Sequence, residues 1–239
     1  MGILDYIFPQ GNKCIFCGYE IPDVCICEDC YKSLPFIEGK TCLKCGGKVF
    51  ANEDVCIDCK SNDIKFEKGF CILDYKDEVQ MKILKFKSGG YKNIGYTLSH
   101  LILDKFKTLD IPFDEIIPVP IHENRRKLRG FNQSEILCEE LKKYYGRVHP
   151  ELLIRWIDTP HQTGLDRNNR KTNLDGAFKV SDKKRIKGKI ILLVDDNYAC
   201  FLHQLELYQH IVQIILIEKH QLFQKLQPYH TYYRFLLKF

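Results

Sequence analysis

The sequence predicts an α/β protein, in which a parallel-sheet domain follows a small cysteine-rich module. Four Cys-x-x-Cys pairs fall within the first sixty of the 239 residues, and cysteines become sparse after Lys60. Beyond that point, segments with helical spacing alternate with strand-like segments that are apolar throughout, as is typical of strands buried on both faces of a parallel sheet. We therefore expect a cysteine-rich module at 1–62, a sheet domain at 63–196 and a tail of different composition at 197–239.

The composition is that of a folded protein without a strong charge signature. Hydrophobic residues make up 45% of the chain and charged residues 28%, which is enough for a core. The formal charge of +5 suits a phosphate-bearing partner but does not single out nucleic acid. The apolar start, Met1–Pro9, lacks the features of a secretory signal, and the apolar run 211–217 is far shorter than the ~20 residues that cross a bilayer. We expect a cytoplasmic protein with no membrane partner.

Eight of the twelve cysteines predict two zinc sites. They form the pairs Cys14/Cys17, Cys27/Cys30, Cys42/Cys45 and Cys56/Cys59. Without an export signal, such pairs indicate metal binding rather than disulfides. Two Cys-x-x-Cys turns supply the four thiolates of a tetrahedral structural Zn²⁺, whose binding energy folds a module with little core of its own.

The four cysteine pairs could combine into two zinc sites in two ways. The gaps of nine and ten residues within each half suit short hairpins, so we expect the first pair to join the second and the third to join the fourth, as in a double zinc ribbon. A cross-braced module would instead join the first pair to the third. Cys25, two residues before Cys27, is either a substitute ligand or a bystander.

The segments after the cysteines give the expected order of elements. We expect a strand at 70–75, helices at 79–86 and 94–106, a buried strand at 114–120, a basic loop at 122–130, a helix at 131–145 and an apolar strand at 189–196. A second basic, polar stretch runs from 161 to 173 and includes Arg170.

Two strand ends carry the residues that suggest chemistry. Ligands of parallel sheets bind at the carboxyl ends of the strands, so the basic loop after Pro120 should face the Asp195–Asp196 pair, with 161–173 as a lid. Arginines bind phosphate oxygens in pairs, whereas carboxylates accept from hydroxyls or hold Mg²⁺ through water. The combination suits a substrate with phosphates and ribose hydroxyls, although a solvated turn and a plain strand end would each explain one part.

With these motifs in view, residues 1 to about 196 resemble the ComF family of competence-associated proteins, which join a zinc module to a type I phosphoribosyltransferase-like domain. The resemblance rests on Phe8-Pro9, the four cysteine pairs, Ile117-Pro-Val-Pro120, Arg129-Gly-Phe-Asn-Gln133, Gln162 with Arg170, Asn173-Leu174, Ala177-Phe178 and Ile191-Leu-Leu-Val-Asp-Asp196.

The resemblance implies a phosphoribosyltransferase-like fold and a pocket for 5-phosphoribosyl 1-pyrophosphate (PRPP) with Mg²⁺. Asp195 and Asp196 would be the catalytic pair that binds the ribose hydroxyls. The substrate-binding residues would be Arg125, Arg126, Arg129 and Gly130 near the pyrophosphate, with Arg170 in the mobile hood at 161–173. The family is linked to incoming single-stranded DNA during natural transformation, which implies single-stranded DNA and a competence helicase-type protein as partners.

The chain departs from the family pattern after Asp196. The family's phosphate loop, Thr-Thr-Gly-x-Thr, cradles a 5′-phosphate at a helix N-terminus, but here Phe201 stands where the glycine should be. Residues 197–239 also contain no Gly and no Asp, and hold four of the eight histidines. The abrupt change indicates either a reading-frame shift near codon 197 or a genuine divergent tail. We expect poor PRPP binding, an inactive transferase, and a sheet without its last strand and helix.

Two functions are therefore open. One is a phosphoribosyltransferase-like enzyme, active or degenerate. The other is a non-catalytic module that handles single-stranded DNA or senses a nucleotide, with the zinc ribbons contacting nucleic acid or a helicase.

Overall fold

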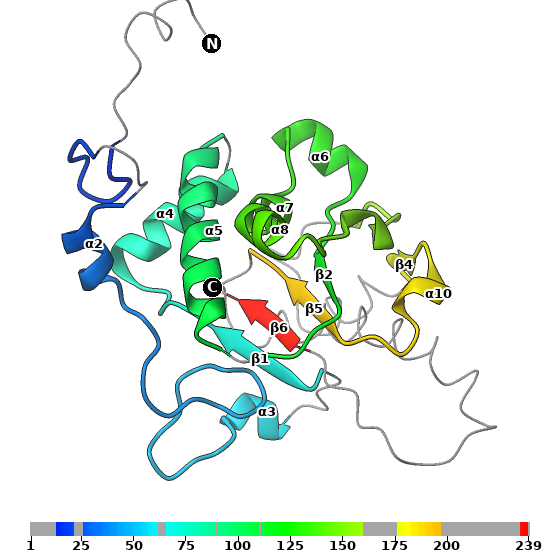
Figure 1. The fold of residues 1–239 in the computed structure, drawn as a ribbon, viewed down its shortest axis with the longest axis horizontal. Coiled ribbons are helices and arrows are strands. Elements are labelled where there is room, and N and C mark those ends of the chain that lie inside the picture. The colour runs from blue at the N-terminus through cyan, green and yellow to red at the C-terminus, as the bar shows by residue number, and fades with distance from the viewer. Residues whose placement is uncertain are drawn as a thin grey trace, which may run out of the picture.

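A four-stranded parallel sheet lies at the centre of the computed structural model, which describes residues 13–21, 26–61, 66–88, 90–109, 111–159, 176–196 and 235–238. The strand order is β1-β6-β5-β2, and Figure 1 shows the four strands side by side. They are β1 (Lys68–Cys71), β2 (Glu115–Pro118), β5 (Ile191–Val194) and β6 (Phe235–Lys238). The expected α/β class with a parallel sheet is confirmed, whereas the phosphoribosyltransferase-like fold stays a prediction.

The strand β5 is apolar throughout and β2 is apolar after Glu115, in keeping with the burial of both faces of each strand. The register places Ile116 beside Leu192, and Ile117 beside Leu193. Successive side chains of a strand point to opposite faces, so these two pairs enter different cores. Ile116 and Leu192 belong to a core shared with the helices, whereas Ile117 and Leu193 belong to a second core shared with buried cysteines.

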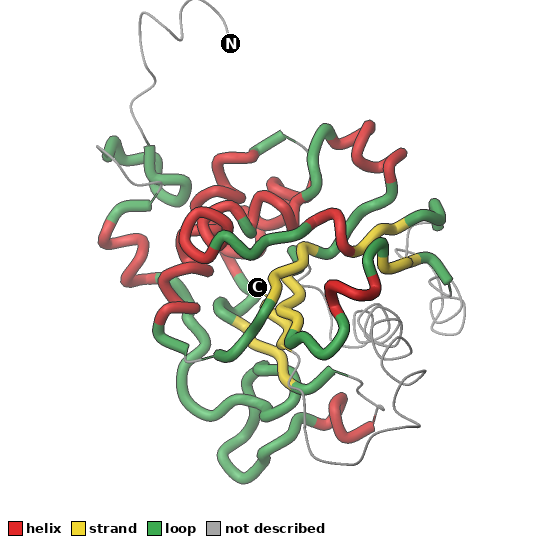
Figure 2. The backbone as a smooth tube through the Cα atoms, turned by 45° about the vertical axis from the view of Figure 1, so that its right-hand side comes forward, coloured by secondary structure: helices red, strands yellow, loops and turns green. Residues whose placement is uncertain are grey.

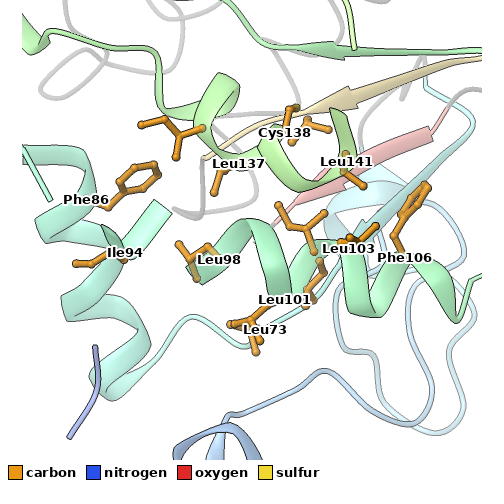
Figure 3. Packing of buried hydrophobic residues seen from close by; sticks show 14 of the residues in the cluster. Leu73, Phe86, Ile94, Leu98, Leu101, Leu103, Phe106, Leu137, Cys138 and Leu141 are labelled. Atoms are coloured by element: carbon orange, nitrogen blue, oxygen red, sulfur yellow. The ribbon is translucent and has the colours of Figure 1, made fainter. Parts of the chain in front are cut away.

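Helices cover the first face of the sheet. They are α4 (Asp77–Ser88), α5 (Lys92–Lys107), α7 (Gln133–Leu137) and α8 (Glu139–Tyr145). Figure 3 shows Leu98 and Leu103 of α5 packing against Leu137 and Leu141 of α7 and α8. Each such side chain stabilises the fold by about 1.5–3 kcal/mol when fully buried. The helices expected at 79–86 and 94–106 are confirmed, and no helix among the described residues is both long and apolar enough to span a bilayer.

The second face carries the second half of the cysteine module, with Cys42, Cys45 and Cys59, and a small antiparallel pair of strands. This pair is β3 (Leu153–Arg155), which follows the short 3-10 helix η1 (Pro150–Leu152), and β4 (Phe178–Val180). The helix α10 (Lys183–Ile186) leads from β4 into β5, and its Ile186 is buried in the second core. Figure 2 shows most of the described helices gathered on one side of the central strands.

Both edges of the sheet are covered by backbone. Along β1, the Gly69 amide donates to the Lys44 carbonyl at 2.5 Å, and the Ile37 amide donates to the Ile72 carbonyl at 3.0 Å. Along β2, the Ile116 amide donates to the Arg147 carbonyl at 2.8 Å. These bonds satisfy groups that would otherwise form an open, association-prone edge, so the cysteine module is part of the sheet architecture.

The prediction of a basic loop at 122–130 is wrong, because most of these residues form the helix α6 (Glu123–Arg129). His122 caps its start by accepting a hydrogen bond from the Asn124 amide through Nδ1 at 3.2 Å. Gly130 ends it in the left-handed conformation, with φ of 81°. Arginine, lysine and leucine are good helix formers, so the charge that suggested a loop belongs to a short exposed helix.

The prediction of a single helix at 131–145 is also wrong, since this segment is divided at Cys138 into α7 and α8. The Ser99 hydroxyl of α5 donates to the Leu137 carbonyl at 2.9 Å and accepts from the Glu140 amide at 2.9 Å. A side chain inserted in this way replaces bonds of the helix itself and interrupts it.

The expected absence of a last strand is wrong as well. The strand β6 belongs to the tail and pairs in parallel with β1 on one side and with β5 on the other. The tail therefore supplies a central strand. The helix expected to be missing falls among residues 197–234, which lie outside the described residues.

Candidate functional site

The first cysteine cluster consists of two short turns facing each other. The Gly18 amide donates to the Cys14 carbonyl at 2.9 Å, which closes the turn between Cys14 and Cys17. The second turn opens the helix α2 (Glu28–Ser33), which carries Cys30 and follows Cys27. The Sγ atoms of Cys14, Cys17, Cys27 and Cys30 all lie within 4.8 Å of one another.

The second cluster repeats this design. The Gly46 amide donates to the Cys42 carbonyl at 2.9 Å, and the helix α3 (Ile57–Ser61) carries Cys59. The Sγ atoms of Cys42, Cys45, Cys56 and Cys59 again lie within 4.8 Å of one another. The expected joining of first with second pair and third with fourth is confirmed, and the cross-braced alternative is wrong. Cys25 lies outside the described residues.

The sulfur positions fit zinc. A Zn–S distance of about 2.3 Å makes each edge of a tetrahedral site about 3.8 Å long. The Sγ atoms of Cys17 and Cys27 are 3.6 Å apart, and those of Cys45 and Cys56 are 3.8 Å apart. The Cys56 amide also donates to Cys42 Sγ at 3.3 Å, as expected around thiolates. The two clusters therefore fit two closed, four-thiolate zinc sites.

The thiols of the second cluster differ in their pKa values. Hydrogen bonds from Cys59 and from the Gly47 amide lower the pKa of Cys45 to about 6, against the effect of burial. Burial raises the pKa of Cys56 to about 11. Zinc binds thiolates, so metal binding must release the remaining protons, and affinity must fall in acid.

The carboxylate pair expected at the end of the last apolar strand directly follows β5. Asp195 is 2% exposed, and its Oδ1 accepts from the Ser134 hydroxyl at 3.2 Å and from the Asp196 amide at 2.9 Å. Burial raises the pKa of the half-buried Asp196 to about 7, the neighbouring Asp195 carboxyl adds to this, and Lys87 and Arg129 oppose it. The pair thus combines one fixed acceptor with one carboxyl that titrates near neutrality.

The predicted arginines of α6 point in different directions. Arg125 donates to the Thr159 carbonyl at 2.6 Å, while Arg126 forms a two-pronged ion pair with Glu135 at 2.6 and 2.8 Å. Arg129 donates to the Gln133 side chain at 3.5 Å and lies near enough to Asp196 to lower its pKa. Arg126 is therefore engaged away from the carboxylates.

The remaining predicted residues serve the backbone or are not described. Gly130 ends α6, and its amide donates to the Arg126 carbonyl at 2.7 Å. Arg170 and the expected lid at 161–173 lie outside the described residues, as do Phe201 and the expected phosphate loop.

Sequence reasoning missed two cations beside the carboxylates. Lys87, at the end of α4, lowers the pKa of Asp196, and Arg155, at the end of β3, is close enough to Asp195 to be affected by its charge. The available signals were weak: a lysine before a glycine pair, and an arginine that ends an apolar run. Both residues are far from Asp195 in the chain, so only the fold brings them together.

Two cavities lined by described residues lie elsewhere. One of about 410 Å³ lies between the second cysteine cluster and β1, and one of about 430 Å³ lies beside the first cluster. Neither of these two cavities is lined by Asp195 or Asp196, and the candidate site is defined by the chemistry of its residues.

Comparisons with known proteins agree with the two cysteine clusters. Residues 3–60 match the family described as "Double zinc ribbon domain". The chain is 27% identical over 196 residues to Competence protein F of Haemophilus influenzae, covering 77% of this chain and 83% of that protein.

Two further relatives cover a similar length. DNA utilization protein YhgH of Escherichia coli K12 is 27% identical over 178 residues, with 72% of this chain and 77% of that protein covered. Competence protein ComFC of Bacillus subtilis is 26% identical over 192 residues, with 74% of each covered. The resemblance to the ComF family is confirmed.

Proposed function

We propose, from its homology to competence and DNA utilization proteins, that this protein acts in the uptake or use of external DNA through a PRPP-type pocket stabilised by two zinc ribbons. The observation that carries the pocket is the Asp195–Asp196 pair at the carboxyl end of β5, with Arg129 and Lys87 beside it. The eight clustered cysteines are the ligands of two structural zinc ions in this proposal.

Each part of the pocket has a chemical task. The Asp195 and Asp196 carboxylates accept from two ribose hydroxyls, while Mg²⁺ would supply charge neutralisation for the pyrophosphate. Arg125 and Arg129 face the pyrophosphate end. The tail lacks the Thr-Thr-Gly-x-Thr loop, so the 5′-phosphate loses its cradle and PRPP binds weakly.

Calorimetry with PRPP and Mg²⁺ tests the pocket. We expect weak binding that Asp195→Asn abolishes, with Asp104→Asn, an exposed α5 carboxylate, as the control. Grafting Thr-Thr-Gly-x-Thr after Asp196 should tighten it. The PRPP pocket is refuted if neither the wild type nor the grafted variant binds PRPP. It is also refuted if Asp195→Asn binds PRPP as well as the wild type does.

A second candidate function, non-catalytic handling of single-stranded DNA, is favoured by exposed aromatics on the cysteine module. Phe50 is 85% exposed and Tyr19 is 71% exposed, and exposed rings of this kind stack on bases. An oligonucleotide titration at several salt concentrations tests it. Binding that weakens steeply with salt and is lost in Phe50→Ala and Tyr19→Ala would favour this function.

A further inference from the structure

The cavity of about 410 Å³ lies where the cysteine module meets the edge of the sheet. Three separate parts of the chain line it: residues between 37 and 46 of the module, residues 68–72 along β1, and the end of α5. Its volume is within the roughly 300–1,000 Å³ of pockets that hold small molecules. A ligand in this cavity would therefore touch the module and the sheet domain at once.

Apolar side chains form one part of the cavity wall. Ile37 and Ile72 are buried, whereas Phe70 and Leu109 are half-buried. Covering such surface with an apolar group is favourable, because water leaves both the wall and the ligand. The wall therefore favours a ligand with an apolar ring or chain.

Two lysines and one glutamate supply the charge of the cavity. Lys68 Nζ lies 5.2 Å from the centre of the Phe70 ring, so this cation sits against the apolar wall. Lys105 is half-buried, and Glu38 is exposed. Within the described part of the chain, no ion pair involves any of these three charged side chains. Two positive charges and one negative charge leave the lining with a net charge of +1 that an anionic ligand can neutralise.

We propose that this cavity binds a small amphipathic monocarboxylate. The carboxylate pairs with Lys68 and Lys105, and the apolar body of the ligand packs against Phe70. One negative charge completes the neutralisation of the lining, whereas a phosphate monoester carries nearly two and leaves an excess beside Glu38. The carboxylate pair at the end of β5 does not line the cavity, so this site goes beyond the proposed PRPP pocket and does not depend on it.

Calorimetric titration of the full zinc-loaded chain with 2-naphthoate and with 2-naphthamide tests the site. The two probes share one apolar ring system, and only naphthoate carries a charge. We expect naphthoate to bind roughly 3- to 10-fold more tightly, the effect of a partly exposed charge-assisted hydrogen bond. Lys105→Gln should remove this preference by weakening the binding of naphthoate alone. Unchanged binding of naphthamide to the variant shows that the cavity is still formed.

Lys107→Gln is the matched control, because it removes the same charge from the same helix at a position that does not line the cavity. Lys107 is exposed, and its Nζ lies 4.7 Å from the centre of the Tyr144 ring. We expect this variant to bind both probes as the wild type does. Equal weakening of naphthoate by Lys105→Gln and Lys107→Gln would overturn the proposal, because the charge of the whole protein would then explain the attraction.

A third probe, 2-naphthyl phosphate, tests the class of anion. We expect it to bind the wild type more weakly than naphthoate does, because its second charge has no partner in the cavity. Tighter binding of naphthyl phosphate would overturn the assignment to a carboxylate. The site itself is refuted if the wild type binds neither naphthoate nor naphthamide, or if it binds the two equally.

Discussion

Asp196 is an acid whose surroundings place its titration near neutrality. Burial raises its pKa from 3.8 to about 7, with Asp195 adding to the rise and Lys87 and Arg129 opposing it. A raised carboxyl pKa in the folded state means that folding is favoured by the protonated form. The contribution is fully present below pH 4 and is lost as the pH rises through about 7.

Asp196→Asn should remove this pH dependence, because asparagine resembles the protonated acid at every pH. Without Mg²⁺, we expect the variant to gain stability over wild type as the pH rises from 5 to 8. Urea unfolding at several pH values measures the gap in unfolding free energy. Asp104→Asn, at an exposed position, is the control for removing a surface carboxylate, and a gap for Asp196→Asn that stays constant with pH would contradict the assignment.

The residues of the candidate site differ in how far local sequence could reveal them. Asp195 and Asp196 follow an apolar run directly, and the eight cysteines have diagnostic spacing, so both groups were predictable. Arg126 was grouped with Arg125 because they are adjacent in sequence, yet Glu135 holds it elsewhere. Arg155 was missed because its proximity to Asp195 depends on the fold and not on any motif.

At the scale of elements, a close backbone approach joins the second cysteine cluster to the sheet. A Cβ on Gly46 would lie 2.5 Å from the Gly69 carbonyl oxygen, and a Cβ on Gly69 would lie 2.7 Å from the Cys45 carbonyl oxygen. Both distances are below the 3.0 Å that real Cβ atoms essentially never show, and both are to backbone atoms and not to the end of a flexible side chain. Only glycine at both positions permits this approach.

Gly46→Ala should therefore separate the cluster from β1. Gly39→Ala is the matched control, because its φ of 78° is close to the 75° of Gly46 but nothing lies within 4 Å of its added Cβ. The left-handed conformation alone should cost each variant about 1–2 kcal/mol. We expect Gly46→Ala to cost a further 1–3 kcal/mol, roughly, from overpacking, measured by chemical denaturation. Equal losses would show that the contact is unimportant.

Helices were predictable where the spacing of apolar residues alone determines them. The three core positions of α4, Val79, Ile83 and Phe86, follow from helical spacing and are the residues buried in the structure. The division between α7 and α8 was not predictable, because the Ser99 side chain that interrupts the ladder comes from another helix. Sequence periodicity does not contain such tertiary contacts.

At the scale of the whole molecule, the two cysteine clusters are unequal. Cys45 is fully buried and belongs to the core that also contains Ile117 and Leu193, whereas the first cluster reaches the other core through the buried Cys14 and leaves Cys17 exposed. The second cluster is thus continuous with the sheet domain, and the first cluster packs beside α4 through contacts such as Lys82 over the Phe16 ring at 5.8 Å.

Substituting one ligand in each cluster should separate their contributions. We expect Cys17→Ser and Cys45→Ser each to lower the zinc content from two ions to one, measured by metal analysis. Cys45→Ser should also cost about 4 kcal/mol or more of global stability, as the loss of a structural metal in a core does. Cys17→Ser should cost less, because Cys17 itself is exposed and lies outside both cores, and equal destabilisation by both would contradict this division.

The whole sheet was only partly predictable. The strands β2 and β5 lie within the segments 114–120 and 189–196, where buried strands were expected. The strand β6 was not, because its segment carries no motif and its place between β1 and β5 depends on pairings with residues distant in sequence.

The central position of β6 also bears on biosynthesis. In the register of β1 and β6, Lys68 lies beside Phe235, so strands at opposite ends of the sheet domain must meet. A nascent chain that has released β1, β2 and β5 from the ribosome still lacks the strand that joins β1 to β5. The sheet cannot close until translation has passed Lys238, and its half-formed state must persist for as long as synthesis of the tail takes. For that interval, the nascent chain is a natural client for chaperones that bind exposed apolar strands.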